Sequence, residues 1–207
     1  MAKNIKLPLH NKYIKRVLTD AEQETLAEAT NQNGNGKLYT FLLYTGLRLN
    51  EALALLWNDV DFQKETVRVN KARTVIGKPK LCRVIPLSAD VNQLLQTIRA
   101  EQEKSRRLGD EYQDNGLIFS KTTGEYLEVT TIGRKFRELV RGIGLPITMH
   151  GLRHSYIARC LEIFTDMKVE HEFPGYSGIE KISDMYIHAL EDNKNEDPVA
   201  KGGGSDG

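Results

Sequence analysis

The chain has 207 residues, of which 40% are hydrophobic and 28% charged, enough apolar material for one ordinary domain core. No apolar run approaches the roughly 20 residues that a membrane helix needs, and the chain does not begin with an apolar signal segment. Its two cysteines, Cys82 and Cys160, lack the spacing of a metal site. We therefore expect no metal, no disulfide, no membrane contact and a reducing cytoplasm.

The net charge of +1 conceals an uneven distribution of acids and bases. Residues 162–207 carry eleven acids and four bases, which leaves a charge of +8 for the first 161 residues. Residues 64–83 alone hold seven bases and one acid. Such a stripe can neutralise several phosphates of a nucleic acid, although a solvated hairpin face can have the same composition. Charge alone leaves both interpretations open.

The first predicted helix starts at a capping box, Thr19-Asp-Ala-Glu22, and runs from Asp20 to about Ala29. Turn-forming residues occupy 31–36. Two apolar helices are predicted next, the first over residues 38–47 and the second with its buried face formed by Leu49, Leu53 and Leu56.

After Trp57 the hydrophobic period becomes that of strands. Strands are predicted around 60–62, 66–69, 74–76 and 82–87, with a turn at 77–80, and they are followed by helices at 88–104, 130–140, 149–163 and 180–190 and a short buried piece at 117–119. The sum is an α+β fold, mainly α-helical with one small antiparallel β-sheet. We expect one domain over 17–190, preceded by a linker segment (1–16) and followed by an acidic flexible tail (191–207).

Three short patterns lie in order along the chain: Thr45-Gly-Leu-Arg-Leu-Asn-Glu51, His150-Gly-Leu-Arg-His154, and Gly175 followed eleven residues later by Tyr186. Trp57-Asn-Asp-Val60 comes just after the first pattern. Each pattern alone is weak, but their order and spacing together resemble the catalytic domain of tyrosine recombinases, the phage-integrase family, over roughly residues 17–190. The resemblance implies that family's fold and a DNA breaking and rejoining enzyme.

The resemblance implies a site that works without metal or cofactor. Arg48 and Arg153 are the expected phosphate clamp, because the planar guanidinium matches two phosphate oxygens. Tyr186 is the expected nucleophile, which forms a covalent 3′-phosphotyrosine and releases a 5′ hydroxyl. His150 joins this catalytic set, and Glu51 corresponds to an acid that orients the first arginine. Each residue taken singly also suits a structural role, as a salt bridge or a buried helix position.

The general acid of the family is a lysine in the turn between two strands. Lys78 lies in the predicted turn, eight residues before Pro86, which is the family's usual spacing. We expect Lys78 to protonate the leaving 5′ oxygen. Lys71 and Lys80 are its competitors for this role.

One position departs from the family pattern. Where relatives usually carry His, and sometimes Trp, after the glycine of the third box, this chain has Tyr176. A phenol can hydrogen-bond a phosphate oxygen, but it is neutral near pH 7 and stabilises charge less than a protonated imidazole does. Tyr176 therefore joins the expected catalytic set, and two alternatives stay open: a catalytically impaired DNA-binding module of the same fold, or a type IB topoisomerase-like strand transferase.

The expected partner is double-stranded DNA, in site-specific integration or excision of a bacterial or phage-encoded mobile element. Family members usually carry a separate helical core-binding domain ahead of the catalytic one, so we expect this chain to be a fragment that binds DNA weakly. We expect a homotetramer on DNA for the full-length protein and a monomer for the isolated domain. The expected DNA contacts are basic: Lys71, Arg73, Lys80, Arg83, Arg134, Lys135 and Arg137.

Overall fold

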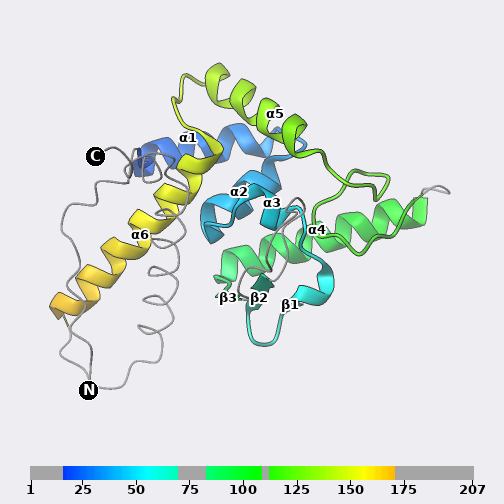
Figure 1. Cartoon of the computed structure of the whole chain (residues 1–207), viewed down its shortest axis with the longest axis horizontal. Helices are drawn as coiled ribbons and strands as arrows, with labels where there is room; N and C mark the ends of the chain where they lie inside the picture. Colours follow the sequence, from blue (N-terminus) through cyan, green and yellow to red (C-terminus); the bar gives the residue numbers. More distant parts are fainter. Residues whose placement is uncertain (1–15, 70–82, 109–111, 171–207) are drawn as a thin grey trace, which may run out of the picture.

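The computed structural model describes residues 16–69, 83–108 and 112–170. Within these ranges the chain is mainly helical with one small antiparallel sheet, as predicted (Figure 1). The elements in chain order are α1 (Asp20–Asn31), α2 (Gly36–Thr45), α3 (Leu49–Ala52), the 3-10 helix η1 (Trp57–Asp59), β1 (Val60–Asp61), β2 (Thr66–Val69), β3 (Arg83–Pro86), α4 (Ala89–Leu108), α5 (Val129–Gly142) and α6 (Met149–Glu170).

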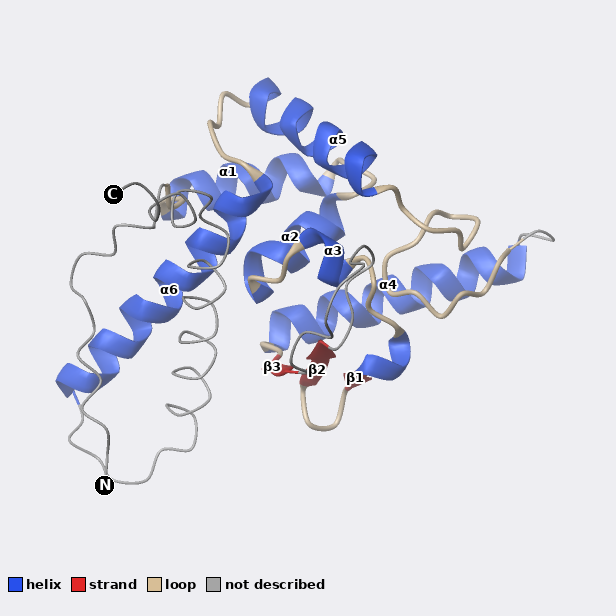
Figure 2. Cartoon of the chain, viewed as in Figure 1, coloured by secondary structure: helices blue, strands red, loops and turns tan. Residues whose placement is uncertain are grey.

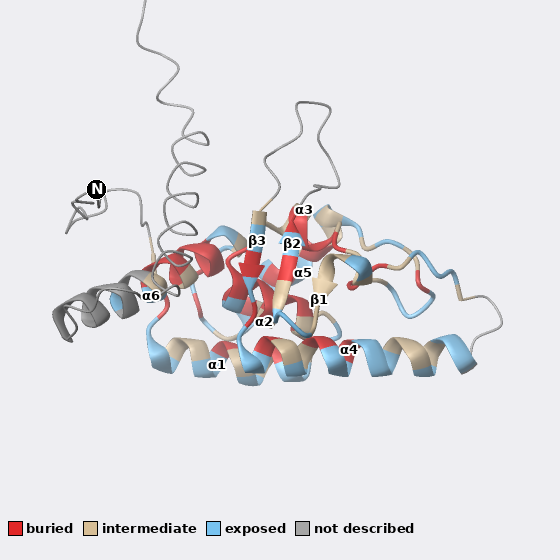
Figure 3. Cartoon of the chain, turned by 90° about the horizontal axis from the view of Figure 1, so that it is seen from below, coloured by how far each residue is buried: buried red, intermediate tan, exposed pale blue. Residues whose placement is uncertain are grey.

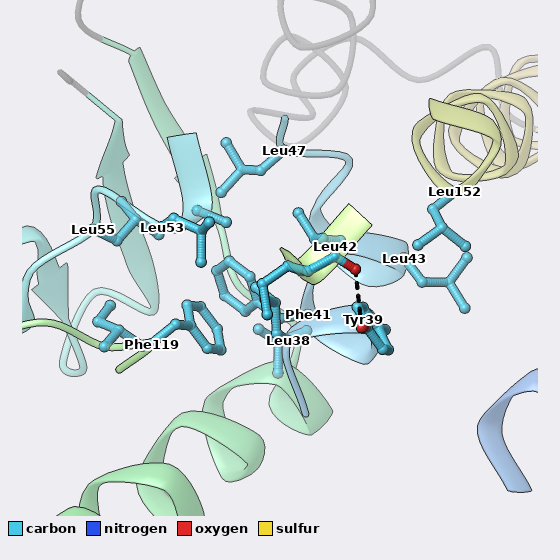
Figure 4. Close-up of a cluster of buried hydrophobic side chains, with 14 of the residues drawn as sticks. Leu38, Tyr39, Phe41, Leu42, Leu43, Leu47, Leu53, Leu55, Phe119 and Leu152 are labelled. Atoms are coloured by element: carbon cyan, nitrogen blue, oxygen red, sulfur yellow. Dashed lines mark hydrogen bonds between the residues drawn. The ribbon is translucent and has the colours of Figure 1, made fainter. Parts of the chain in front are cut away.

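Helix α2 forms the centre of the core. Most of its residues are apolar, and seven of its ten positions are buried. In Figure 4, Leu53, Leu55 and Phe119 lie on one side of this helix and Leu152 of α6 on the other. Phe41 and Phe119 pack with their ring centroids 5.0 Å apart. A helix that is apolar over most of its circumference must be covered on most sides, and α1, α3, α4 and α6 all pack against α2, although Tyr44 remains exposed.

The three strands within the described ranges form a sheet of order β1-β2-β3 in which both neighbouring pairs are antiparallel (Figure 2). The register pairs Val67 with Ile85, which are both buried. Because residues two apart on a strand share a face, Val69 and its partner Arg83 lie on this same inward face. Val84 lies on the opposite face and is 55% exposed.

The outer helices are amphipathic, and each presents one stripe to the core. On α4, Val91, Leu95 and Ile98 are buried, and its exposed positions lie on the outer side in Figure 3. On α5, the buried stripe is Ile132, Phe136 and Val140. Helix α1 begins with the predicted capping box: the Thr19 hydroxyl accepts from the Glu22 N–H at 3.3 Å, and the Glu22 carboxylate accepts from the Thr19 N–H at 3.0 Å.

The predicted helix through Leu49, Leu53 and Leu56 is wrong beyond Ala52, where α3 ends. The chain turns here to pair with a distant segment: the Ile118 N–H donates to the Leu55 carbonyl at 3.1 Å, and the Trp57 N–H donates to the Gly116 carbonyl at 2.9 Å. Tertiary pairing thus overrides the local helical period. Helix α6 extends to Glu170, seven residues beyond the predicted end at 163.

Three predicted elements, at 74–76, 77–80 and 180–190, fall outside the described residues. Across the residues that are described, no helix is both long and apolar enough to cross a bilayer. The same residues hold no cluster of His, Cys, Asp and Glu arranged to bind a metal ion.

Candidate active site

The site is built on a sharp turn between α2 and α3. Gly46 ends α2 in the left-handed conformation, with φ of 61°, and its N–H donates to the Leu42 carbonyl at 3.0 Å. A Cβ at this position would lie 2.3 Å from Cδ1 of Tyr156 on α6. Both the backbone angle and the close approach of α6 therefore require glycine here. The turn places Arg48 at the N-cap position of α3, in an extended conformation.

Arg153 on α6 reaches the same turn. Its side chain is buried, with only 5% of the residue exposed. Its Nη1 donates to the carbonyl of Gly46 at 2.5 Å, two residues before Arg48. The charge of Arg153 thus remains compatible with burial, because a carbonyl accepts from it in a charge-assisted hydrogen bond. Arg48 and Arg153 come from distant parts of the sequence, and the fold brings both to the turn after α2.

Glu51 contacts both the backbone and the side chain of Arg48 at this turn. Its carboxylate accepts from the Arg48 backbone N–H at 3.0 Å and lies 3.8 Å from the Arg48 Nη1. Arg83 on β3 donates to both oxygens of the same carboxylate, at 3.0 and 2.6 Å. Glu51 is 3% exposed. This buried carboxylate therefore lies between two guanidinium groups, and it contacts the backbone of Arg48 as well as its side chain.

The ionisation of Glu51 depends on these neighbours. Burial raises the pKa of the Glu51 carboxyl, because a charged group loses hydration there. The hydrogen bonds and charge of Arg83, together with the backbone N–H and charge of Arg48, outweigh burial and hold the pKa below its ordinary value of 4.5. Glu51 is therefore a carboxylate near neutral pH, and it partly compensates the positive charge of the site.

Arg83 was predicted from the sequence as a DNA contact, but its guanidinium is directed inward to Glu51. The reason is its register on β3, which puts it on the same face as the buried Ile85. A contact between Arg83 and DNA stays a prediction, and the described geometry gives this residue a different partner. The strand alternation around Val84 was the sequence signal for this inward direction.

The two histidines of the second pattern lie one turn apart on α6. His150 is exposed, His154 is 8% exposed, and their rings meet edge to face with centroids 5.1 Å apart. Ser155 is buried next to them; its hydroxyl accepts from the Leu18 N–H and donates to the Gly151 carbonyl, both at 2.9 Å. The segment just before α1 is thus hydrogen-bonded to the helix that carries His150 and Arg153.

The predicted DNA-contacting residues of α5 lie on its outer face. Arg134, Lys135 and Arg137 are all exposed, opposite the buried stripe of this helix. Arg134 also pairs with Glu138 at 2.8 Å, one helical turn further on. These bases form an accessible positive surface, and their contact with DNA stays a prediction.

The remaining predicted site residues fall outside the described residues. They are the nucleophile Tyr186, the neighbouring Tyr176, the three candidate acids Lys71, Lys78 and Lys80, and the predicted DNA contact Arg73. Whether they join the two arginines stays a prediction. Sequence reasoning in turn missed two features that the structure shows: the pairing of Arg83 with Glu51, and the close packing of Tyr156 on Gly46.

A model of the phage integrase family matches residues 14–193. The chain belongs to this family. The two arginines that meet at the turn after α2 are those of the first two family patterns. Family membership thus accounts for a shared location that the sequence alone could not demonstrate.

Curated members of the family include relatives of moderate identity. A tyrosine recombinase XerC-like protein of Caldanaerobacter subterraneus subsp. tengcongensis is 25% identical over 199 residues, which cover 85% of this chain and 51% of that protein. The tyrosine recombinase XerC of Chlamydia caviae is 30% identical over 146 residues, which cover 70% of this chain and 43% of that protein. The chain thus spans about half the length of the curated relatives it matches.

Solved structures show the same fold. The Tn1549 transposon integrase, in complex with transposon right end DNA, matches with a TM-score of 0.61 at 23% identity. The match covers 87% of this chain and 64% of that one. The described helices and small sheet are therefore those of a tyrosine recombinase catalytic domain, as predicted from the sequence.

Proposed function

We propose that this chain is the catalytic domain of a site-specific tyrosine recombinase, which integrates or excises a mobile element by cutting and rejoining double-stranded DNA. The observation that carries the proposal is the shared location of Arg48 and Arg153 at the turn after α2, in a member of the phage integrase family. Two guanidinium groups at one site suit a phosphate diester, since each presents paired donors to its oxygens.

The proposed reaction is a transesterification. The phenol oxygen of Tyr186 attacks the scissile phosphorus, the bond from phosphorus to the 5′ oxygen breaks, and Lys78 donates a proton to that leaving oxygen. The phenol proton passes to a base, for which His150, exposed on the first turn of α6, is the described candidate. Arg48 and Arg153 stabilise the charge on the five-coordinate phosphate. The phosphotyrosine bond conserves the energy of the phosphodiester, so rejoining needs neither ATP nor metal.

DNA is the proposed partner, and the solved complex of the Tn1549 integrase with transposon DNA supports this choice. The exposed bases of α5 are the proposed contacts among the described residues. We expect the isolated chain to be a monomer and the longer protein to act as a tetramer on DNA, in a bacterial or phage setting. Binding by this chain should be weak and strongly salt-dependent, because phosphate contacts dominate it.

A suicide substrate tests the proposal. We would incubate the chain with a pool of duplexes that have a randomised core and a nick in one strand, so that the cleaved fragment diffuses away. The expected result is a covalent protein–DNA adduct on a denaturing gel, which disappears in Tyr186→Phe and survives in Tyr126→Phe. Tyr126 is the matched control because it is an exposed tyrosine, 46% accessible, with no proposed role in the reaction.

The other outcomes separate the alternatives. DNA binding without any adduct would favour the catalytically impaired binding module that Tyr176 suggests. Relaxation of a supercoiled plasmid without exchange between two DNA partners would favour a topoisomerase-like strand transferase. An adduct that persists in Tyr186→Phe would refute Tyr186 as the nucleophile.

A further inference from the structure

Within the described part of the site, the Glu51 carboxylate accepts hydrogen bonds from both Arg83 and Arg48. Its Oε2 accepts from the Arg83 Nη2 at 2.6 Å and from the Arg48 backbone N–H at 3.0 Å. Its Oε1 accepts from the Arg83 Nη1 at 3.0 Å and lies 3.8 Å from the Arg48 Nη1. Arg83 therefore donates two hydrogen bonds to the carboxylate. Arg48 donates one through its backbone N–H, and its guanidinium lies at ion-pair distance.

Arg83 is placed for this contact by the sheet. It is the first residue of β3 and lies on the inward face, opposite Val69. Its side chain is 16% exposed, compared with 4% for the side chain of Glu51. An arginine in this setting is enclosed by the protein rather than offered to solvent, and its planar fork fits a carboxylate with two parallel hydrogen bonds.

The arrangement makes Glu51 depend on Arg83. A buried carboxylate that loses its hydrogen-bonded cation takes up a proton more readily or moves toward water, because burial of a poorly paired charge is costly. The 3.8 Å approach of the Arg48 Nη1 is too long for a hydrogen bond. Loss of Arg83 would thus remove two of the hydrogen bonds that hold this carboxylate. The contact of Glu51 with Arg48, the N-cap residue of α3, would then be less firmly fixed.

We propose that Arg83 is a positioning residue for the phosphate clamp: by holding the Glu51 carboxylate in a two-pronged ion pair, it fixes the backbone and the guanidinium of Arg48. This inference rests on the proposed function, since it concerns how that site is held in place. It assigns Arg83 an action through Glu51, in place of the direct DNA contact expected from the sequence. It also links β3 to the turn after α2, two elements that supply different parts of the site.

The test compares the full chain with four variants in the nicked-duplex assay. Arg83→Lys keeps the charge but loses the fork, and Arg83→Met removes both. Glu51→Gln combined with Arg83→Met also removes the carboxylate that has lost the Arg83 guanidinium. Arg106→Met is the control, because Arg106 is likewise an ion-paired arginine, with Glu103 and Asp114 as its partners, but it lies on the exposed end of α4. Adduct formation at saturating DNA, DNA affinity, melting temperature and the pH profile are measured for each.

The expected result for both Arg83 variants is a loss of about 10- to 100-fold in the saturated rate of adduct formation, the range seen for groups that orient metal ligands, with DNA affinity nearly unchanged. Arg83→Met should also lose activity at a higher pH on the acid side than the unaltered chain does, because Glu51 then binds a proton more readily. The double variant should lack this added acid sensitivity. Arg106→Met should behave as the unaltered chain.

Four outcomes would overturn the inference. A direct DNA contact would instead weaken affinity and reduce the salt slope by about 1, with an unchanged saturated rate. A purely structural role would lower activity only in proportion to the folded fraction, equally at every pH. If the unaltered chain forms no adduct and relaxes no plasmid, the proposed function fails and this inference fails with it, whereas adduct formation with insensitive Arg83 variants refutes this inference alone.

Discussion

The turn at Gly46 offers the sharpest test of how the site is built. We predict that Gly46→Ala destabilises the chain more than Gly144→Ala does. Both glycines have positive φ, 61° and 68°. Their surroundings differ: a Cβ at Gly46 would lie 2.3 Å from Cδ1 of Tyr156, and a Cβ at Gly144 would meet nothing within 4 Å. Gly144 is therefore a control for backbone strain without the steric clash.

The magnitude has two parts. A left-handed backbone costs an ordinary residue about 1–2 kcal/mol, and both variants carry this cost. At Gly46 the added methyl overlaps a partly buried aromatic ring by roughly 1 Å, and overpacking of this kind costs about 1–3 kcal/mol. We therefore expect losses of about 2–5 kcal/mol for Gly46→Ala and about 1–2 kcal/mol for Gly144→Ala.

Urea denaturation of both variants measures this difference, provided that the dependence of unfolding free energy on urea is the same in each. For a domain of this size, each kcal/mol of lost stability lowers the melting temperature by about 2–4 °C. The expected difference of about 1–3 kcal/mol between the two variants should therefore also appear as a difference in melting temperature. Gly46→Ala should also slow adduct formation beyond its loss of folded protein, because the Gly46 carbonyl accepts from Arg153. Equal stability losses in the two variants would show that Tyr156 of α6 does not pack against Gly46 as closely as described.

Three further predictions concern stability. Thr19→Ala should lower the unfolding free energy by about 1 kcal/mol, because it removes the hydroxyl that caps the Glu22 N–H; an unchanged urea midpoint would contradict this. Gln102→Leu should cost about 2 kcal/mol or more, since the Gln102 amide bonds Trp57 Nε1 and two carbonyls of residues 117 and 118; thermal melting checks it. Burial raises the pKa of the Tyr39 phenol from 10.0 to about 12, so the wild type should lose up to about 3 kcal/mol of stability between pH 10 and pH 12. Tyr39→Phe should lose about 1 kcal/mol below pH 10, because the Tyr39 hydroxyl donates to the Ile132 carbonyl, but it should lose less stability than the wild type between pH 10 and pH 12. Parallel curves for the two proteins over that range would refute the assignment.

The sequence predicted the elements that depend on local chemistry. The capping box at Thr19 marked the start of α1, and the helix predicted over 88–104 is α4, with Val91, Leu95 and Ile98 on its buried face. These signals act within one or two helical turns, where backbone geometry determines which side chains share a face. They require no knowledge of what the face packs against.

The errors arose where distant residues decide the structure. Leu56 fits a helical period after Leu49 and Leu53, but its segment bridges instead to Leu117, a partner that no local window contains. Arg83 was grouped with neighbouring bases by charge, whereas its direction follows from the antiparallel pairing with Val69. Spacing along the chain can show that two arginines belong to the patterns of one family, but only the fold shows that Arg153 donates to the Gly46 carbonyl, two residues before Arg48.

The described half of the site is already assembled within the protein. Arg153 is bound to the Gly46 carbonyl, and Arg48 is held at its backbone by Glu51, which Arg83 fixes in turn. An arginine side chain carries about 2 kcal/mol of rotamer entropy, and a clamp that had to be ordered on binding would lose much of it at that moment. Because these contacts restrict both arginines beforehand, a phosphate bound as proposed would meet charges that need little rearrangement. Fixed donors stabilise a transition state most effectively under this condition. Under the proposed function, the stability of the Gly46 turn and the charge on Glu51 therefore bear on catalysis, and variants that disturb either one should affect the rate of strand cleavage before they affect the binding of DNA.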